Sequence, residues 1–402
     1  MKTSFYIITV LMITILVACV KEKEISPTQA DNFLKMYGSY KANEGYDLKQ
    51  TSDGGYIITG KTMISELNED IILIKTDQYG NQKWEKTFDV ANGNDSGNSL
   101  EIDSDGGFII FGTCTNLAGN TDMFLLKTNS TGDSLWSKQI DVLSLNQEGK
   151  SVNTTVDGGY ILVGTTEVIG VDGTHKDIYM VKMDVSGNKI WEKTYGSSTE
   201  DDDARCVIEN YDNKYMIIGK TKSFPINPND VSYNIYVTIN SPVEGAVINF
   251  CTYGKSSEDE GVGVVKTSET NYIMAGTISD NSTKKIYVRK FGNDQSSGLQ
   301  DSIWVKNFNG TGNTFARSIS STADNGIVIV GMDVDGTNSD IYIIKIDNDG
   351  NEVFSQTFGG EKRDEGNAVI ETSNNGFAII GTTEYDNRSM ICLIKTNSVG
   401  NL

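Results

Sequence analysis

The stretch 152–164 reads Val-Asn-Thr-Thr-Val-Asp-Gly-Gly-Tyr-Ile-Leu-Val-Gly, and variants of it occur seven times along the 402-residue chain. An Asp-Gly pair between apolar runs is a strong β-hairpin signal, because glycine reaches positive φ without steric cost. Successive copies end in a glycine every 50 to 57 residues, which leaves room for four short strands and their turns. These closing glycines are Gly60, Gly112, Gly164, Gly219, Gly276, Gly331 and Gly381.

The repeat predicts an all-β fold, a seven-bladed β-propeller with four antiparallel strands per blade, over residues 31–402. The segment 32–38, Asn-Phe-Leu-Lys-Met-Tyr-Gly, matches the fourth strand of a repeat but stands alone before the first copy. The last copy lacks its fourth strand. An open solenoid gains nothing from this offset, whereas a ring can use it to close. We therefore expect the strand around Phe33 to pair with 391–395 and complete the last blade.

Strand B of each copy is apolar at every position, which is typical of a strand covered on both faces. In the third copy we expect strands A to D at 150–154, 160–165, 177–183 and 189–195. One position of strand D is aromatic in most copies, and we interpret these side chains as packing between blades. They are Trp84, Trp136, Trp191, Trp304, Phe354 and, in the N-terminal segment, Phe33.

The first 18 residues have the organisation of a secretory signal peptide. Lys2 precedes an apolar run over 5–18, which is too short to span a bilayer. The run ends in Leu-Val-Ala-Cys at 16–19, which resembles the lipobox of bacterial lipoproteins. The resemblance implies that Cys19 is lipidated, becomes the first residue after cleavage and anchors the chain in a membrane. An ordinary signal peptide is the alternative. Residues 19–30 then form the lipidated cysteine and a polar tether.

The repeats resemble the Asp-Gly-Gly-Tyr propeller repeats of many secreted bacterial proteins over about residues 31–402. Together with the lipobox, this resemblance implies a lipid-anchored protein of the cell envelope, at the outer membrane or the cell surface. The formal net charge of −20 repels phosphate backbones, so we expect no nucleic-acid partner. We also expect a monomer.

An acidic side chain recurs at the start of strand A, the innermost strand, near one mouth of the central channel. A ring of carboxylates there could hold Ca²⁺ through oxygen ligands, and we expect no other cofactor. Alternatively, each carboxylate caps backbone amides of the adjacent blade or pairs with Arg205 or Arg317. Ser96 and Phe315 break the series. The acidic residues are Glu44, Glu148, Asp203, Glu260 and Glu365.

Other reactive residue types are few. The only histidine, His175, falls between strands B and C of the third copy, and we interpret it as a surface loop residue. A single histidine leaves no multi-histidine metal site. Without a Cys-x-x-Cys pattern, the remaining cysteines are predicted to be buried free thiols. They are Cys114, Cys206, Cys251 and Cys392.

The sequence favours a non-enzymatic binding or scaffold protein for a protein or glycan partner. We expect the partner near the longest insertions, 223–232 and 291–301, and we expect residues 293–299 to be dispensable for folding. A second hypothesis is an extracellular carbohydrate-active enzyme that uses channel-mouth carboxylates such as Glu148 and Glu260. A third is a structural subunit of an envelope complex.

Overall fold

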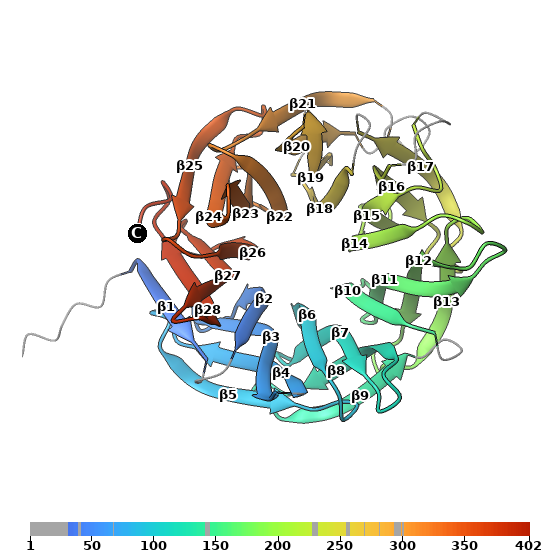
Figure 1. Cartoon of the computed structure of the whole chain (residues 1–402), viewed down its shortest axis with the longest axis horizontal. Helices are drawn as coiled ribbons and strands as arrows, with labels where there is room; N and C mark the ends of the chain where they lie inside the picture. Colours follow the sequence, from blue (N-terminus) through green and yellow to red (C-terminus); the bar gives the residue numbers. More distant parts are fainter. Residues whose placement is uncertain are drawn as a thin grey trace, which may run out of the picture. The chain divides into compact units, whose positions relative to one another are not determined.

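The computed structural model describes residues 31–38, 42–66, 68–140, 145–226, 232–254, 258–268, 270–280, 282–292, 299 and 301–402. Asp31–Leu402 form one compact unit, a seven-bladed β-propeller with four antiparallel strands in each blade (Figure 1). The predicted signal peptide, Cys19 and the tether lie outside the described residues. Over the described ranges, no helix has the length and hydrophobicity needed to cross a bilayer.

Each of the first six blades uses four consecutive strands, with the first strand innermost. The strands of blades one to three are β2 Asn43–Gln50, β3 Tyr56–Ser65, β4 Asn68–Thr76, β5 Gln82–Phe88, β6 Asp95–Ile102, β7 Phe108–Thr115, β8 Thr121–Thr128, β9 Ser134–Ile140, β10 Gln147–Thr154, β11 Tyr160–Ile169, β12 Thr174–Met183 and β13 Lys189–Tyr195. Those of blades four to six are β14 Asp202–Glu209, β15 Tyr215–Thr221, β16 Asn234–Asn240, β17 Val247–Tyr253, β18 Glu260–Lys266, β19 Tyr272–Asp280, β20 Thr283–Phe291, β21 Ser302–Phe308, β22 Asn313–Ser321, β23 Ile327–Asp335, β24 Asn338–Ile346 and β25 Glu352–Phe358.

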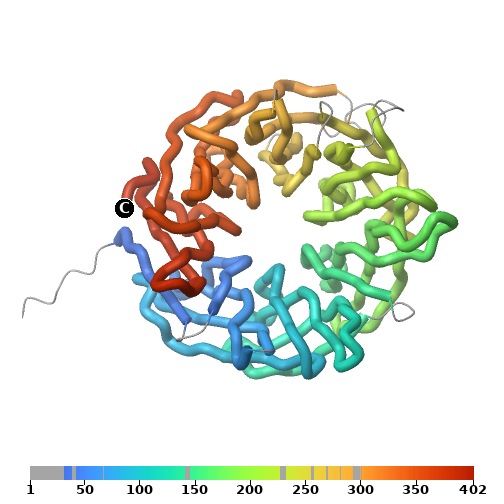
Figure 2. Tube along the Cα trace, viewed as in Figure 1, coloured from blue at the N-terminus to red at the C-terminus, as the bar shows by residue number. Residues whose placement is uncertain are grey.

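The seventh blade joins both ends of the propeller, as the sequence predicts. It contains β26 Asp364–Glu371, β27 Phe377–Tyr385, β28 Arg388–Thr396 and, as its outermost strand, β1 Phe33–Tyr37. β1 runs antiparallel to β28, with Phe33 opposite Lys395 and Tyr37 opposite Ile391. In Figures 1 and 2 the blue start of the propeller lies beside its red end. The ring is therefore closed by backbone hydrogen bonds between the first and last strands.

The turn between the first two strands of each blade needs a residue at positive φ. Gly54, Gly106 and Gly158 supply it in blades one to three. The later blades use non-glycine residues at the same place, which are Asn213, Thr270, Asn325 and Asn375. Asparagine tolerates this conformation through local hydrogen bonding. Blade five keeps the same turn with Thr270 at a φ of 62°, which a β-branched residue rarely adopts.

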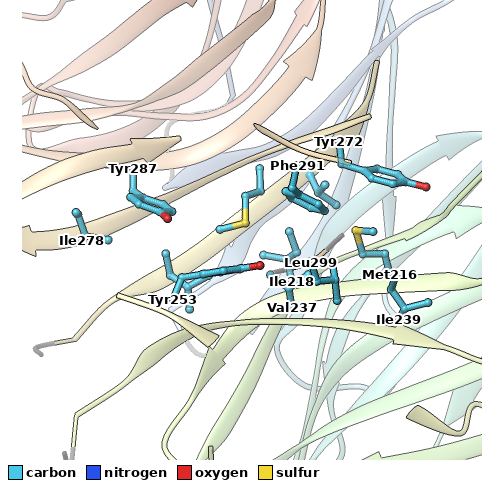
Figure 3. Close-up of a cluster of buried hydrophobic side chains, with 13 residues drawn as sticks. Met216, Ile218, Val237, Ile239, Tyr253, Tyr272, Ile278, Tyr287, Phe291 and Leu299 are labelled. Atoms are coloured by element: carbon cyan, nitrogen blue, oxygen red, sulfur yellow. The ribbon is translucent and has the colours of Figure 1, made fainter. Parts of the chain in front are cut away.

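The strand-D aromatics pack between blades, which confirms the prediction. Trp191 of blade three lies 6.0 Å, centroid to centroid, from Tyr215 of blade four. Phe33 lies 6.4 Å from Tyr56, so the closing strand makes the same contact across the seam. A cluster of 13 buried side chains continues this packing between blades four and five (Figure 3). Leu299, which is 1% exposed, belongs to that cluster. The expectation that 293–299 is dispensable is therefore wrong at Leu299, which serves the core.

Candidate functional site at the channel mouth

Every innermost strand carries one β-bulge at the same place. In β10 the pairing with β11 skips from Gly149 to Ser151, so Lys150 has no partner of its own in the ladder. A bulge redirects the side chain of the extra residue, and bulges often lie beside functional sites. We call the seven extra residues the bulge ring. They are Tyr46, Asn98, Lys150, Arg205, Val262, Arg317 and Asn367.

The closing glycines are the counterpart of these bulges. A Cβ on Gly164 would overlap the carbonyl oxygen of Glu148, and the other six closing glycines meet the equivalent carbonyl in their own blades. Only glycine leaves room for the bulged strand to approach so closely. The crowding explains why glycine recurs at this position in all seven copies.

The bulge ring encloses a polar cavity in the channel. All seven of its residues line a cavity of about 370 Å³, together with Glu260 and Glu365. We call this cavity the channel mouth, because it lies beside the starts of the innermost strands. The lining carries three cations, Lys150, Arg205 and Arg317, in a chain whose net charge is −20. The mouth is thus a locally basic spot on an acidic protein.

The predicted acidic residues lie at this end of the channel, two positions before the bulge in their strands. Five of the seven blades each supply one, and the five carboxylates do not form a single cluster. Within the described ranges, no group of three or more His, Cys, Asp or Glu side chains is arranged to hold a metal ion. Calcium binding by the five carboxylates stays a prediction.

Ion pairs with nearby cations occupy these carboxylates. Arg205 joins two of them, because its Nη2 lies 3.5 Å from Asp203 and its Nε donates to Glu260 of the next blade. This is the pairing with Arg205 that the sequence left open. Glu44 lies 3.6 Å from the Nζ of Lys61. Glu365 accepts hydrogen bonds from Arg363.

Glu148 forms ion pairs with two lysines. Burial by itself would raise its pKa, but Lys150 at 2.7 Å and Lys176 at 2.9 Å outweigh burial and hold the pKa at about 2. A catalytic general acid needs the opposite, a raised pKa that keeps the proton near neutral pH. Glu148 therefore does not suit the acid role in the carbohydrate-active hypothesis.

Arg317 differs from the other two cations of the bulge ring. Phe315 occupies the acidic position of blade six, and Arg317 is exposed in the channel. In the part of the chain that the structure describes, no acidic side chain, hydrogen-bond acceptor or aromatic ring contacts its guanidinium. From the sequence, we expected Arg317 only as an ion-pair partner for the acids. In the structure, it forms no ion pair with any of them.

Two asparagines of the bulge ring hold neighbouring blades together. The Nδ2 of Asn98 donates to the Gly149 carbonyl of the next blade at 2.7 Å, and Asn367 does the same to Gly45 across the seam. These matched bonds join blade two to blade three and blade seven to blade one. Two residues of the bulge ring therefore link neighbouring blades around the cavity.

Deeper in the channel, the charges compensate one another. Lys49 and Glu101 form an ion pair of 2.9 Å between blades one and two. Burial raises the pKa of Asp47 to about 6, although its carboxylate accepts hydrogen bonds from the backbone N–H groups of Leu48 and Leu100 at 2.8 Å. These groups join blades rather than offering a free charge.

The prediction that His175 is a surface loop residue is wrong. β11 and β12 extend further than the sequence indicated, so His175 lies within β12 opposite Val168 and is 6% exposed. Its Nε2 lies 3.5 Å from Asp177, whose pKa burial raises to about 7. The four predicted free cysteines are all free, but only Cys114 and Cys392 are buried.

Comparisons with known proteins identify the fold. No protein-family model matches the chain, and no curated protein matches it. YCF48 bound to D1 peptide is a similar solved structure, with 12% identity, a TM-score of 0.53, and coverage of 92% of this chain and 96% of that one. Extracellular domains 1–2 of Drosophila Semaphorin 1b give 9% identity, a TM-score of 0.52, and coverage of 90% and 86%. At these identities the likeness shows the fold alone.

The bulge ring was missed from the sequence, although a signal for it exists. In five of the seven copies, a small residue is followed by a polar residue and then by another small residue, as in Gly149-Lys150-Ser151. A strand with strict alternation would point every second residue the same way. The small residues on both sides of the polar one mark the place where alternation fails.

Proposed function

We propose that this protein is a lipid-anchored, non-enzymatic binding module of the cell envelope that receives a segment of a protein partner at the channel mouth. The observation that carries the proposal is the exposed, unpaired Arg317 in a polar cavity bounded by the bulge ring. A ligand pocket generally combines a preformed cavity with a few placed polar groups, and this cavity falls in the size range of such pockets.

The cavity favours a chain segment over a folded surface. Its volume of about 370 Å³ admits one or a few side chains. A second cavity of about 320 Å³ shares Tyr46, Glu365 and Asn367 with it and continues along the blade-seven hairpin past Arg363 and Arg388. An extended peptide could fill both. The structure of YCF48 bound to D1 peptide gives a precedent for a peptide partner on a chain of this fold.

The anchor rests on the lipobox-like residues 16–19 and the preceding apolar run. One acyl chain gives marginal membrane binding, whereas several give a lasting anchor. We expect the wild type in the membrane fraction, carrying metabolically incorporated palmitate. Cys19→Ser should lose the label and the membrane association. Equal labelling of both would contradict the lipid anchor.

Site-specific photo-crosslinking in cells tests the partner. A photoreactive amino acid replaces Val262, which lines the mouth without carrying charge, or Lys193, which is exposed on the outermost strand of blade three. We expect a discrete covalent adduct with one protein from the Val262 position and none from Lys193. An adduct from Lys193 alone would favour a structural subunit that docks by its outer rim. Absence of adducts from Val262 would contradict a partner at the mouth.

A further inference from the structure

We infer that the channel mouth is a carboxylate-binding subsite centred on Arg317, and that it takes an acidic side chain or the C-terminal carboxylate of the partner segment. This inference rests on the proposed function and adds the chemistry of the ligand. Among the five arginines of the chain, Arg317 is set apart by its lack of a partner in the described residues.

Each of the other four arginines contacts an acidic or aromatic side chain. Arg205 pairs with Asp203 and Glu260, and Arg363 pairs with Glu365. Arg289 lies over the ring of Tyr253 at 4.1 Å, and Arg388 lies 3.9 Å from Asp386. A chain with 54 acidic and 34 basic residues offers many partners for an arginine. The free guanidinium in the channel is therefore a local exception to the charge balance of the molecule.

The charges of the cavity indicate a ligand with a single negative charge. Its lining holds three cations and two acids, Glu260 and Glu365, so one positive charge is in surplus. A phosphate group carries nearly two negative charges at neutral pH and would be repelled more strongly by those two acids. A carboxylate carries one. The planar guanidinium can also donate two parallel hydrogen bonds to it.

Phe315 keeps this cation available. In blade three, Glu148 stands two residues before Lys150 and lies 2.7 Å from it, and in blade four Asp203 has the same relation to Arg205. Phe315 stands at that position in blade six and cannot form an ion pair. A ligand carboxylate would supply the group that blade six lacks.

The test measures binding of fluorescein-labelled tetraglutamate to the detergent-solubilised full chain by fluorescence anisotropy. Tetraglutamine with an amidated C-terminus is the matched probe without carboxylates. We expect the wild type to bind tetraglutamate and not amidated tetraglutamine. Arg317→Ala should weaken binding at least about tenfold, or 1.4 kcal/mol, and Arg317→Lys should weaken it less because lysine keeps the charge without the planar fork. Lys193→Ala should bind like the wild type.

C-terminal amidation of the probe distinguishes the two carboxylate sources. Loss of binding on amidation identifies the terminal carboxylate, and retained binding identifies the side chains. Failure of the wild type to bind tetraglutamate, or equal binding by Arg317→Ala with an unchanged melting temperature, would overturn the inference. In either case, an adduct from the Val262 crosslinker would show that the partner site stands and that only the ligand class is wrong.

Discussion

Blades four and six build the same bulge and place an arginine on it, yet the two arginines have different surroundings. Arg205 has Asp203 two residues before it and Glu260 in the next blade. Arg317 has Phe315 at the first of these positions and no acidic partner in the described chain. Since backbone and residue type are the same, the neighbouring residues decide the role. A paired arginine joins two blades, and an unpaired one is available to a ligand.

Both blades belong to one ring, and we expect the largest effect from removing a contact between neighbouring blades. Trp191 packs against Tyr215 and Gly245 of blade four and donates a hydrogen bond to the Pro242 carbonyl at 3.2 Å. Trp191→Ala should cost about 3 kcal/mol of unfolding free energy as a large-to-small core substitution. Urea denaturation checks this value.

Lys193→Ala on the same strand is the control for Trp191→Ala. Its side chain is exposed, so the change should stay within about 0.5 kcal/mol. If Trp191→Ala proved as mild as this control, the aromatic contacts between blades would not stabilise the ring.

Alanine substitutions at Arg205 and Arg317 should have different effects on stability. Arg205→Ala leaves Asp203 and Glu260 without their shared cation, in a setting between exposed and buried. We expect a loss of about 1–2 kcal/mol, between the values typical of surface and buried pairs. Arg317→Ala should change stability by less than about 0.5 kcal/mol because no pair is broken. Equal losses in the two variants by urea denaturation would contradict the difference between the blades.

The pH dependence at blade three gives a smaller effect with a defined sign. Glu148 has a pKa of about 2 in the folded chain against 4.5 ordinarily, so the unfolded state takes up its proton first. Its stabilising contribution is present above pH 4.5 and declines as the pH falls toward 2.

Unfolding free energies at several pH values test this in the wild type and Glu148→Gln. We expect the advantage of the wild type to shrink as the pH falls from about 6 to about 3. Arg317→Ala serves as the comparison, because blade six has no acid at that position and its difference from the wild type should stay constant. A wild-type advantage that grows in acid would contradict the pairing of Glu148 with Lys150 and Lys176.

The ring was predictable because its signals are local and recur seven times. The closing glycines, the turn residues and the isolated strand at Phe33 each follow from backbone geometry within one copy, and the structure confirms them. The acidic positions were found for the same reason. Of their partners, only Arg205 was predicted from the sequence, since Lys61 and Lys176 reach the acids from other strands. Arg317 is unpaired because no acidic side chain of the described residues contacts it, and no single sequence motif shows such an absence.

Other predictions failed or remain open for physical reasons. His175 was placed on the surface because no residue pattern indicated that the β11–β12 hairpin continues past Thr165. Much of the insertions 223–232 and 291–301 lies outside the described residues, so their role in binding stays a prediction. The lipidation of Cys19 is likewise untested.

Restoring the missing acid tests most directly the claim that its absence frees Arg317. Phe315→Glu should place a carboxylate two residues before Arg317, as in blades three and four. Phe315→Gln is the control, because glutamine has the shape of glutamate without its charge. Tetraglutamate titrations of both variants, with melting curves to verify folding, give the answer. We predict that Phe315→Glu loses binding while Phe315→Gln keeps it. Equal binding by the two folded variants would contradict the account.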